Sequence, residues 1–284
     1  MTNRISIAFS CNNEWIDKLA VTVISILENA NKNDFYHFYI LDGGISKINK
    51  LKLSKIKSKI NFKLEYLKIN KELFKNAPLS HHFKLETYYR LALSNLISDD
   101  KLLYLDVDIL VHKNISELFN IDIENYYAAA VEDILSKERK IHKLNVKKYF
   151  NAGVLLLNLK KIRDENLEKE FFDVINHHSN LITWVDQCVL NHVFKENVKF
   201  LNEKFNFQHH SSITNINNLY KKVKKDVIIT HFVSTKKPWN FEKSIDLIIQ
   251  YYSYLFKTPF KTDSLKTLLK NLIKKIIILY KISH

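Results

Sequence analysis

Strand-like and helix-like apolar patterns alternate along the first part of this chain, and that alternation constrains its fold more than any other feature. Alternating apolar residues predict strands at Arg4–Ser10, His37–Leu41 and Phe62–Leu67. Helical spacing over Leu19–Leu27 and Ile45–Ile60 predicts the helices between them. Strands that alternate with helices usually pair in parallel, with the helices on both faces of the sheet. The sequence therefore predicts an α/β fold with a mostly parallel sheet.

The rest of the chain continues in the same way. We expect helices at Leu85–Leu96, Leu167–His178 and Asp186–Phe194, and strands at Leu102–Val111, Ala128–Glu132, Val154–Leu157 and Val227–Thr230. In sheets of this class, ligands bind beyond the carboxyl ends of the strands. The polar residues Asn12, Asn13, Asp106 and Asp108 occupy such positions, so we expect them to share one edge of the sheet.

The predicted strand Leu102–Val111 carries two carboxylates, Asp106 and Asp108, among almost uninterrupted apolar residues. Residues two apart in a strand point the same way, so both carboxylates can reach one ion near the strand's end. Without a cation between them the two acids would repel each other. The alternative is that both are solvated at the edge of the strand. We interpret the Asp-x-Asp sequence as a metal and diphosphate site.

Composition limits the class of protein. The chain has 284 residues, 46% of them hydrophobic, which indicates a folded protein with one large domain or a domain and an appendage. A net charge of +14 favours polyanionic partners such as nucleic acid, acidic lipid or nucleotide phosphates. The cysteines, Cys11 and Cys188, form no metal or disulfide pattern. No signal peptide and no apolar run of roughly 20 residues is evident, so we expect a cytoplasmic protein.

The C-terminal segment from Lys257 is rich in lysine. Its leucines and isoleucines fall on one side of a helix and its lysines on the other, a pattern typical of an interfacial amphipathic helix. The alternative is a helix docked on the main domain with its lysines in water. We expect one domain over residues 1–256 and a basic amphipathic tail over 257–284 that contacts an anionic membrane surface.

Six segments occur in a particular order along the chain. They are Ala8–Trp15, Tyr88–Leu91, Tyr104–Asp108, Phe150–Val154, Val185–Gln187 and His231–Trp239. Together they resemble glycosyltransferase family 8, the retaining sugar transferases with a GT-A fold, and especially the bacterial lipopolysaccharide galactosyl- and glucosyltransferases. The resemblance implies a Rossmann-like mixed α/β sheet with an Asp-x-Asp metal motif.

The resemblance also implies a metal site. Asp106, Asp108 and His231 would coordinate Mn²⁺, with Mg²⁺ as the alternative, because two hard oxygen donors and one imidazole suit these ions better than a structural zinc. The metal would bridge the diphosphate of a UDP-sugar, and Lys237 would add a second cation there. Taken alone, His231 could be a buried residue at a strand end and Lys237 a surface lysine.

Further positions match residues that hold the donor in this family. Arg90, Asn151 and Asp186 would bind hydroxyls of the donor sugar, although Arg90 alone could be a helix salt bridge and Asn151 a turn residue. Gln187 would lie near the anomeric carbon, so Asp186 and Gln187 are the candidate catalytic residues. An amide is a poor nucleophile, which favours front-face displacement over a covalent glycosyl-enzyme. The remaining candidate donor contacts are Ser10, Asn12, Asn13, Asp106, Val107, Ala152 and Ser234.

Four positions depart from the family pattern. Asn12 stands where an aspartate often binds the uracil ring, and Ser234 replaces a glycine common between the metal histidine and the lysine. Glu14–Trp15 replaces an Asn-Tyr pair. A side chain at Ser234 would keep the backbone farther from the phosphate.

The sequence thus predicts a hexosyltransferase that moves galactose or glucose from a UDP-sugar to a saccharide or glycolipid acceptor, such as the core of lipopolysaccharide or lipooligosaccharide. It would act as a peripheral protein on the inner face of the cytoplasmic membrane. The alternatives are a metal-dependent nucleotidyltransferase, which also needs paired carboxylates, and a basic module that binds nucleic acid or anionic lipid. We expect no nucleic-acid partner, because no arginine-rich stripe or known binding motif is present.

Overall fold

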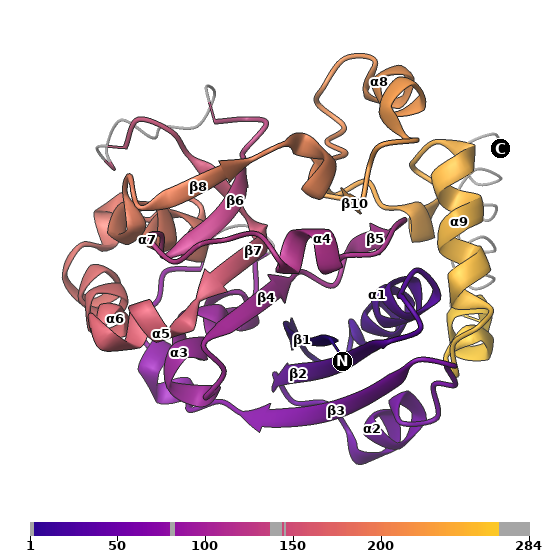
Figure 1. The fold of residues 1–284 in the computed structure, drawn as a ribbon, viewed down its shortest axis with the longest axis horizontal. Coiled ribbons are helices and arrows are strands. Elements are labelled where there is room, and N and C mark those ends of the chain that lie inside the picture. The colour runs from indigo at the N-terminus through magenta and orange to yellow at the C-terminus, as the bar shows by residue number, and fades with distance from the viewer. Residues whose placement is uncertain (1–2, 80–82, 137–143, 145, 267–284) are drawn as a thin grey trace, which may run out of the picture.

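A computed structural model describes residues 3–79, 83–136, 144 and 146–266. The strands are β1 (Asn3–Cys11), β2 (Asp34–Asp42), β3 (Asn61–Lys68), β4 (Lys101–Leu105), β5 (Ile109–Val111), β6 (Ala128–Glu132), β7 (Phe150–Asn158), β8 (Val198–Leu201), β9 (Phe207–Gln208) and β10 (Ile229–His231). A 7-stranded sheet has the order β3-β2-β1-β4-β7-β6-β8, and a 3-stranded sheet has the order β5-β10-β9 (Figure 1). The predicted α/β class is confirmed.

Helices pack on both faces of the large sheet. The described helices are α1 (Ile16–Glu28), α2 (Lys47–Leu53), α3 (Leu93–Leu96), α4 (Ser116–Phe119), α5 (Leu159–Asp164), α6 (Leu167–His177), α7 (Val185–Phe194), α8 (Ile216–Val223) and α9 (Ile245–Leu255). Of these, α8 packs against the small sheet and α9 against α1. Short 3-10 helices lie at Lys71–Phe74, Leu85–Ala92, Ser179–Leu181, Glu203–Phe205 and Pro238–Asn240. Alternate residues of β1 point to opposite faces: Ile7 belongs to the core beneath α1, and Ala8 to the core beneath α6 and α7.

The large sheet is mixed. Strands β3, β2, β1 and β4 are parallel to one another, and β6 is parallel to β8, whereas β7 is antiparallel to both β4 and β6. The expectation of a mostly parallel sheet is therefore confirmed, because β7 alone runs against the other described strands of this sheet. In the register of β4 and β7, Leu105 lies opposite Val154, and the Asp106 N–H donates to the Gly153 carbonyl oxygen at 2.8 Å. This pairing brings the Asn-Ala-Gly segment beside the Asp-x-Asp segment.

The prediction of one continuous strand at Leu102–Val111 is wrong. The chain leaves the large sheet after β4 and enters the small sheet as β5, so Asp106 and Asp108 lie in the link between two sheets. The Thr22 hydroxyl holds this link, at 3.0 Å from the Val107 carbonyl oxygen and 3.1 Å from that of Ile109. The two carboxylates converge because of this bend and not because they share the face of a strand.

Other boundaries also differ from the prediction. Of the helix expected at Ile45–Ile60, only α2 is helical, and it buries the side chain of Leu53. The first part of the helix expected at Leu85–Leu96 is a 3-10 helix. The last predicted strand is shifted, so that His231 belongs to β10, and Asn151 lies within β7 instead of in a turn.

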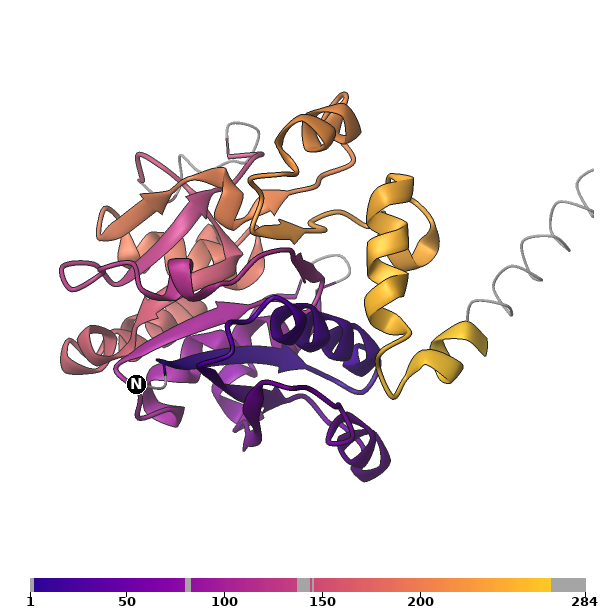
Figure 2. The same ribbon diagram turned by 45° about the vertical axis from the view of Figure 1, so that its right-hand side comes forward.

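The C-terminal part of the described chain packs against the N-terminal part. Helix α9 stands beside α1 at the edge of the molecule (Figure 2). Beyond α9, Phe260 is buried in the core shared with α1, and the Ser264 hydroxyl donates to Asp17 at 2.9 Å. Most of the predicted amphipathic tail, residues 267–284, lies outside the described residues. The described helices include none with the length and apolarity needed to cross a bilayer.

Candidate active site

Asp106, Asp108 and His231 come together at the junction of the two sheets, as predicted. One ligand atom from each lies within 4.8 Å of the other two. The Nε2 atom of His231 is 3.3 Å from Asp108 Oδ1 and 3.6 Å from Asp106 Oδ2. The imidazole is buried, whereas the Asp106 side chain is 27% exposed. The three groups therefore face a site that a ligand can enter.

A chain of hydrogen bonds fixes the orientation of the His231 ring. The Gly153 N–H donates to Asn151 Oδ1 at 3.1 Å, and Asn206 Nδ2 donates to the same oxygen at 3.0 Å. The carbonyl oxygen of the Asn206 amide therefore faces His231 Nδ1, 3.2 Å away, and must accept its proton. This leaves the lone pair of Nε2 directed at the two carboxylates, which is the tautomer that a metal ligand requires.

Gly153 leaves the space that this arrangement needs. A Cβ atom at this position would lie 2.1 Å from His231 Cε1 and 2.7 Å from Asp106 Oδ2. Any side chain would therefore displace two of the three candidate ligands. Two carboxylates and a correctly oriented imidazole, held without a side chain between them, are suited to bind a divalent metal ion.

Lys237 adds a positive charge beside the acids. Its Nζ atom lies 2.6 Å from Asp108 Oδ2 and also donates to the carbonyl oxygen of Phe232. Burial opposes ionisation of Asp108, but the Lys237 ammonium outweighs it and holds the pKa of this carboxyl below its ordinary value. The Lys237 ammonium, in the loop after β10, is thus directed at the second carboxylate of the Asp-x-Asp sequence.

Arg90 connects the acidic pair to Asp186. The guanidinium is buried, donates to Asp106 Oδ1 at 2.7 Å and to the Ala152 carbonyl oxygen, and lies over the ring of Tyr104. Its Nε is 3.0 Å from Asp186 Oδ2, but this N–H donates to the carbonyl oxygen of Thr87. Arg90 is therefore a bridge between two carboxylates and not an ordinary helix salt bridge.

Asp186 is an unusual carboxyl group. It is only 2% exposed, and its Oδ2 atom accepts no hydrogen bond. Burial raises its pKa to about 7, opposed by Arg90 and assisted by Asp106. It follows Val185, a β-branched residue with a φ of 40°, a strained conformation at the start of α7. A buried oxygen that accepts no hydrogen bond and lies beside a polar site is suited to accept one from a ligand.

Gln187 belongs to a buried polar network. Its Oε1 accepts from the Ala152 N–H at 3.0 Å, and its Nε2 donates to Asp133 Oδ2 at 3.0 Å. The amide of Asn151 lies 3.4 Å from the same Asp133 oxygen. We did not single out Asp133 or Asn206 from the sequence. Asp133 directly follows the buried strand β6, as Asp106 follows β4, and this parallel could have identified it.

The predicted nucleotide contacts Ser10, Asn12 and Asn13 lie at the end of β1 and in the loop that follows it. Asn12 Oδ1 accepts from the Glu14 N–H at 3.0 Å, and Asn13 Oδ1 accepts from the Ser46 N–H at 3.0 Å. Asn13 therefore anchors the start of α2. Ser10 lies at the end of β1, and the Val107 carbonyl oxygen accepts from Thr22.

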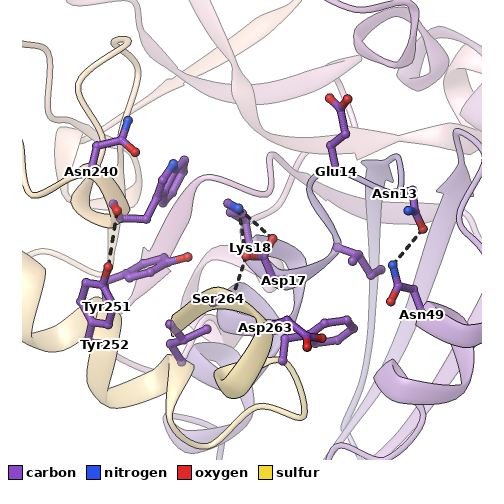
Figure 3. A pocket seen from close by; sticks show the side chains of 14 residues that line it. Asn13, Glu14, Asp17, Lys18, Asn49, Asn240, Tyr251, Tyr252, Asp263 and Ser264 are labelled. Carbon is purple, nitrogen blue, oxygen red and sulfur yellow. Dashed lines mark hydrogen bonds and ion pairs between the residues drawn. The ribbon is translucent and has the colours of Figure 1, made fainter. Parts of the chain in front are cut away.

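A cavity lies beside the loop that follows β1 (Figure 3). Its volume is 290 Å³, and its walls come from α1, α2, α9 and the segment after α9. They include Asn13, Lys18, Trp239, Tyr251 and Asp263. Asn13 is a wall residue, whereas the three candidate metal ligands are not. This cavity is thus a separate feature from the metal site.

The protein has a large mixed sheet joined to a smaller sheet, and Asp106 and Asp108 lie at the junction. The sequence profile described as Glycosyl transferase family 8 matches residues 6–243. The chain belongs to this family and is a glycosyltransferase.

Relatives and solved structures agree with this assignment. A Haemophilus influenzae protein provisionally named a glycosyltransferase is 32% identical over 284 aligned positions, covering 90% of this chain and 84% of the relative. The lipopolysaccharide 1,2-glucosyltransferase of Escherichia coli K12 is 25% identical, covering 92% of this chain and 80% of the relative. A crystal structure of the galactosyltransferase LgtC with donor and acceptor sugar analogs has a TM-score of 0.75 at 26% identity, covering 89% of this chain and 96% of LgtC. The fold is therefore GT-A.

Proposed function

We propose that the protein is a retaining hexosyltransferase that moves galactose or glucose from a UDP-sugar to a saccharide acceptor in the core of lipopolysaccharide or lipooligosaccharide. One observation carries the proposal: Asp106, Asp108 and His231 converge within 4.8 Å, beside Lys237. The names of the relatives, a lipopolysaccharide glucosyltransferase and a galactosyltransferase, support the choice of sugar and acceptor.

Asp106, Asp108 and His231 would hold Mn²⁺, or Mg²⁺ in its place. A divalent ion bound there supplies positive charge to offset the negative charge that develops on the UDP leaving group. Lys237 is paired with Asp108, and we propose that its ammonium contributes to binding the diphosphate. Ser10, Asn12, Asn13, Val107, Ala152 and Ser234 complete the proposed binding site for the donor.

Arg90, Asn151 and Asp186 would hold the donor sugar. Asp186 Oδ2 is buried without a hydrogen bond, so a sugar hydroxyl would satisfy it. The Arg90 guanidinium fixes the positions of Asp106 and Asp186 relative to each other. It would thereby set the position of the sugar relative to the diphosphate. Productive geometry of this kind supplies much of the rate enhancement of a transferase.

Retention would proceed by front-face displacement. The Gln187 amide is a poor nucleophile, and the Asp133 carboxylate already accepts from Gln187 and from the Leu135 N–H. We propose that the acceptor oxygen forms its bond to the anomeric carbon on the face from which UDP departs. The acceptor proton passes to the departing phosphate oxygen, and Gln187 stabilises the positive charge on the sugar ring.

We further propose two parts of the chain with different roles. Residues 1–256 would form the catalytic domain, and the basic amphipathic segment 257–284 would bind the anionic inner face of the cytoplasmic membrane, where glycolipid acceptors are available. The alternation of leucines and lysines in the sequence supports this assignment. The first residues of the segment also pack on the domain through Phe260.

The experiment that tests the function is release of UDP from a panel of UDP-sugars, with Mn²⁺ and with a chelator. Slow hydrolysis of the donor requires no knowledge of the acceptor. Release from one UDP-hexose that stops with the chelator supports the proposal and identifies the donor. Absence of both UDP release and UDP binding across the panel would contradict it.

A further inference from the structure

Lys243 lies between the last 3-10 helix and α9. Its side chain contacts the loop that joins His231 to Lys237. Its Nζ atom donates to the His209 carbonyl oxygen at 2.9 Å and lies 3.0 Å from His209 Nδ1. It also lies 3.3 Å from Ser234 Oγ. The N–H of His209 in turn donates to the His231 carbonyl oxygen at 2.8 Å, so Lys243 is attached to the strand that carries the candidate metal ligand.

The acceptors that hold Lys243 are all neutral. His209 Nε2 lies 2.9 Å from Asn217 Oδ1, which leaves Nδ1 as the acceptor toward Lys243, and burial lowers the pKa of this histidine to about 4. Among the described residues, no carboxylate lies within ion-pair distance of the Lys243 ammonium. A partly buried ammonium held only by neutral groups retains its attraction for an anion.

Other charges around Lys243 add to this attraction. Burial and the repulsion of Lys237 and Lys236 lower its pKa to about 8, opposed by Asp108 and Glu242. Asp108, however, is paired with Lys237 and belongs to the candidate metal site. The loop therefore has an excess of positive charge, which the binding of an anion would relieve.

Ser234 links this feature to a departure of the chain from its family. Where a glycine is common, this chain has a serine, whose hydroxyl lies between Lys243 and the Lys236 carbonyl oxygen, at 3.3 Å from each. The serine side chain thus has a defined partner, and that partner is a lysine. Through Ser234, Lys243 therefore contacts the loop that carries Lys237.

We propose that Lys243 is a second lysine of the donor site, which acts together with Lys237 to bind the diphosphate of the nucleotide. This inference rests on the proposed function and extends it by a residue outside the motifs of the sequence. Neutral acceptors hold the ammonium in place before the donor arrives, so little side-chain entropy is lost when the phosphate binds. The three N–H groups of the ammonium already have acceptors on His209 and Ser234, so its charge attracts the phosphate, and a direct hydrogen bond would replace the 3.3 Å contact with Ser234 Oγ.

The test compares UDP with uridine, which lacks the diphosphate, in binding titrations at a fixed concentration of Mn²⁺. Lys243→Gln keeps a hydrogen-bond donor and removes the charge. We expect it to raise the dissociation constant of UDP about tenfold and to leave that of uridine unchanged. Lys243→Arg should retain the preference for UDP. The matched control, Lys169→Gln, removes one charge from an exposed position on α6 and should change neither constant.

Two results would overturn the proposal. Unchanged binding of UDP by Lys243→Gln would exclude Lys243 from the site, and equal weakening of UDP and uridine would assign it a role in supporting the loop only. Failure of the unaltered protein to bind UDP would instead contradict the proposed function itself. If the glutamine variant does not fold, judged by circular dichroism, Lys243→Met removes the charge with a side chain of similar length and repeats the test.

Discussion

Replacement of Gly153 by alanine tests whether the geometry of the candidate metal site is as tightly defined as its packing indicates. The new Cβ atom would lie 2.1 Å from His231 Cε1, whereas ordinary contact begins at 3.4 Å. The ring or the strand must therefore move by more than 1 Å. Metal ligands tolerate displacements of only about 0.2 Å, so His231 would no longer reach an ion shared with Asp106. We expect the affinity for Mn²⁺ to fall by about 100-fold or more.

The assay is a calorimetric titration of Mn²⁺ into the metal-free protein, with circular dichroism to confirm that the variant folds. Overpacking at this position should also destabilise the protein by about 1–3 kcal/mol. Gly44→Ala is the matched control, because its Cβ would meet nothing within 4 Å, but its φ of 109° disfavours a side chain. It should lower stability by about 1 kcal/mol without changing the affinity for Mn²⁺. If Gly153→Ala binds Mn²⁺ as the unaltered protein does, the reasoning is refuted.

Three further predictions follow from the same residues. Asn206→Ala frees the His231 ring and should weaken Mn²⁺ binding about 10- to 100-fold, and an unchanged titration would contradict this. Because burial raises the pKa of Asp186 from 3.8 to about 7, the folded state binds a proton that the unfolded chain releases. The melting temperature of the metal-free protein should therefore fall as the pH rises from 4 to 7, and Asp186→Asn should flatten that fall; an equally steep profile would contradict it. Removal of residues 267–284 should reduce sedimentation with anionic vesicles while sparing UDP release, and undiminished sedimentation would contradict the proposed tail.

The sequence was sufficient for much of the fold because its strongest patterns are local. β1 and α1 have clear apolar periods of two and of about 3.6 residues, and both were predicted near their observed positions. The run through Leu102–Val111 was misinterpreted, because β5 and all of β4 except Lys101 are buried and no glycine or proline marks the bend between them. A turn fixed by a distant side chain, Thr22, leaves no local signal.

The same limit applies to the site. The acidic pair and His231 belong to recognisable motifs, so the sequence indicated them and the fold brings them together. Asn206 acts through a hydrogen bond to a residue 25 positions away, and Lys243 through contacts with His209 and Ser234. Such residues become evident only when the chain is folded, because their types and spacings are common in sequences without this function.

The central claim is that the acidic pair makes donor cleavage dependent on a metal ion. The most direct measurement is the rate of UDP release from the UDP-hexose that the unaltered protein cleaves, compared between that protein and Asp108→Asn at the same Mn²⁺ concentration. Asp226→Asn, a change at an exposed acid, is the control and should retain the rate. We predict that Asp108→Asn loses UDP release while its circular dichroism spectrum is unchanged. Release at the unaltered rate by a folded Asp108→Asn protein would contradict the claim.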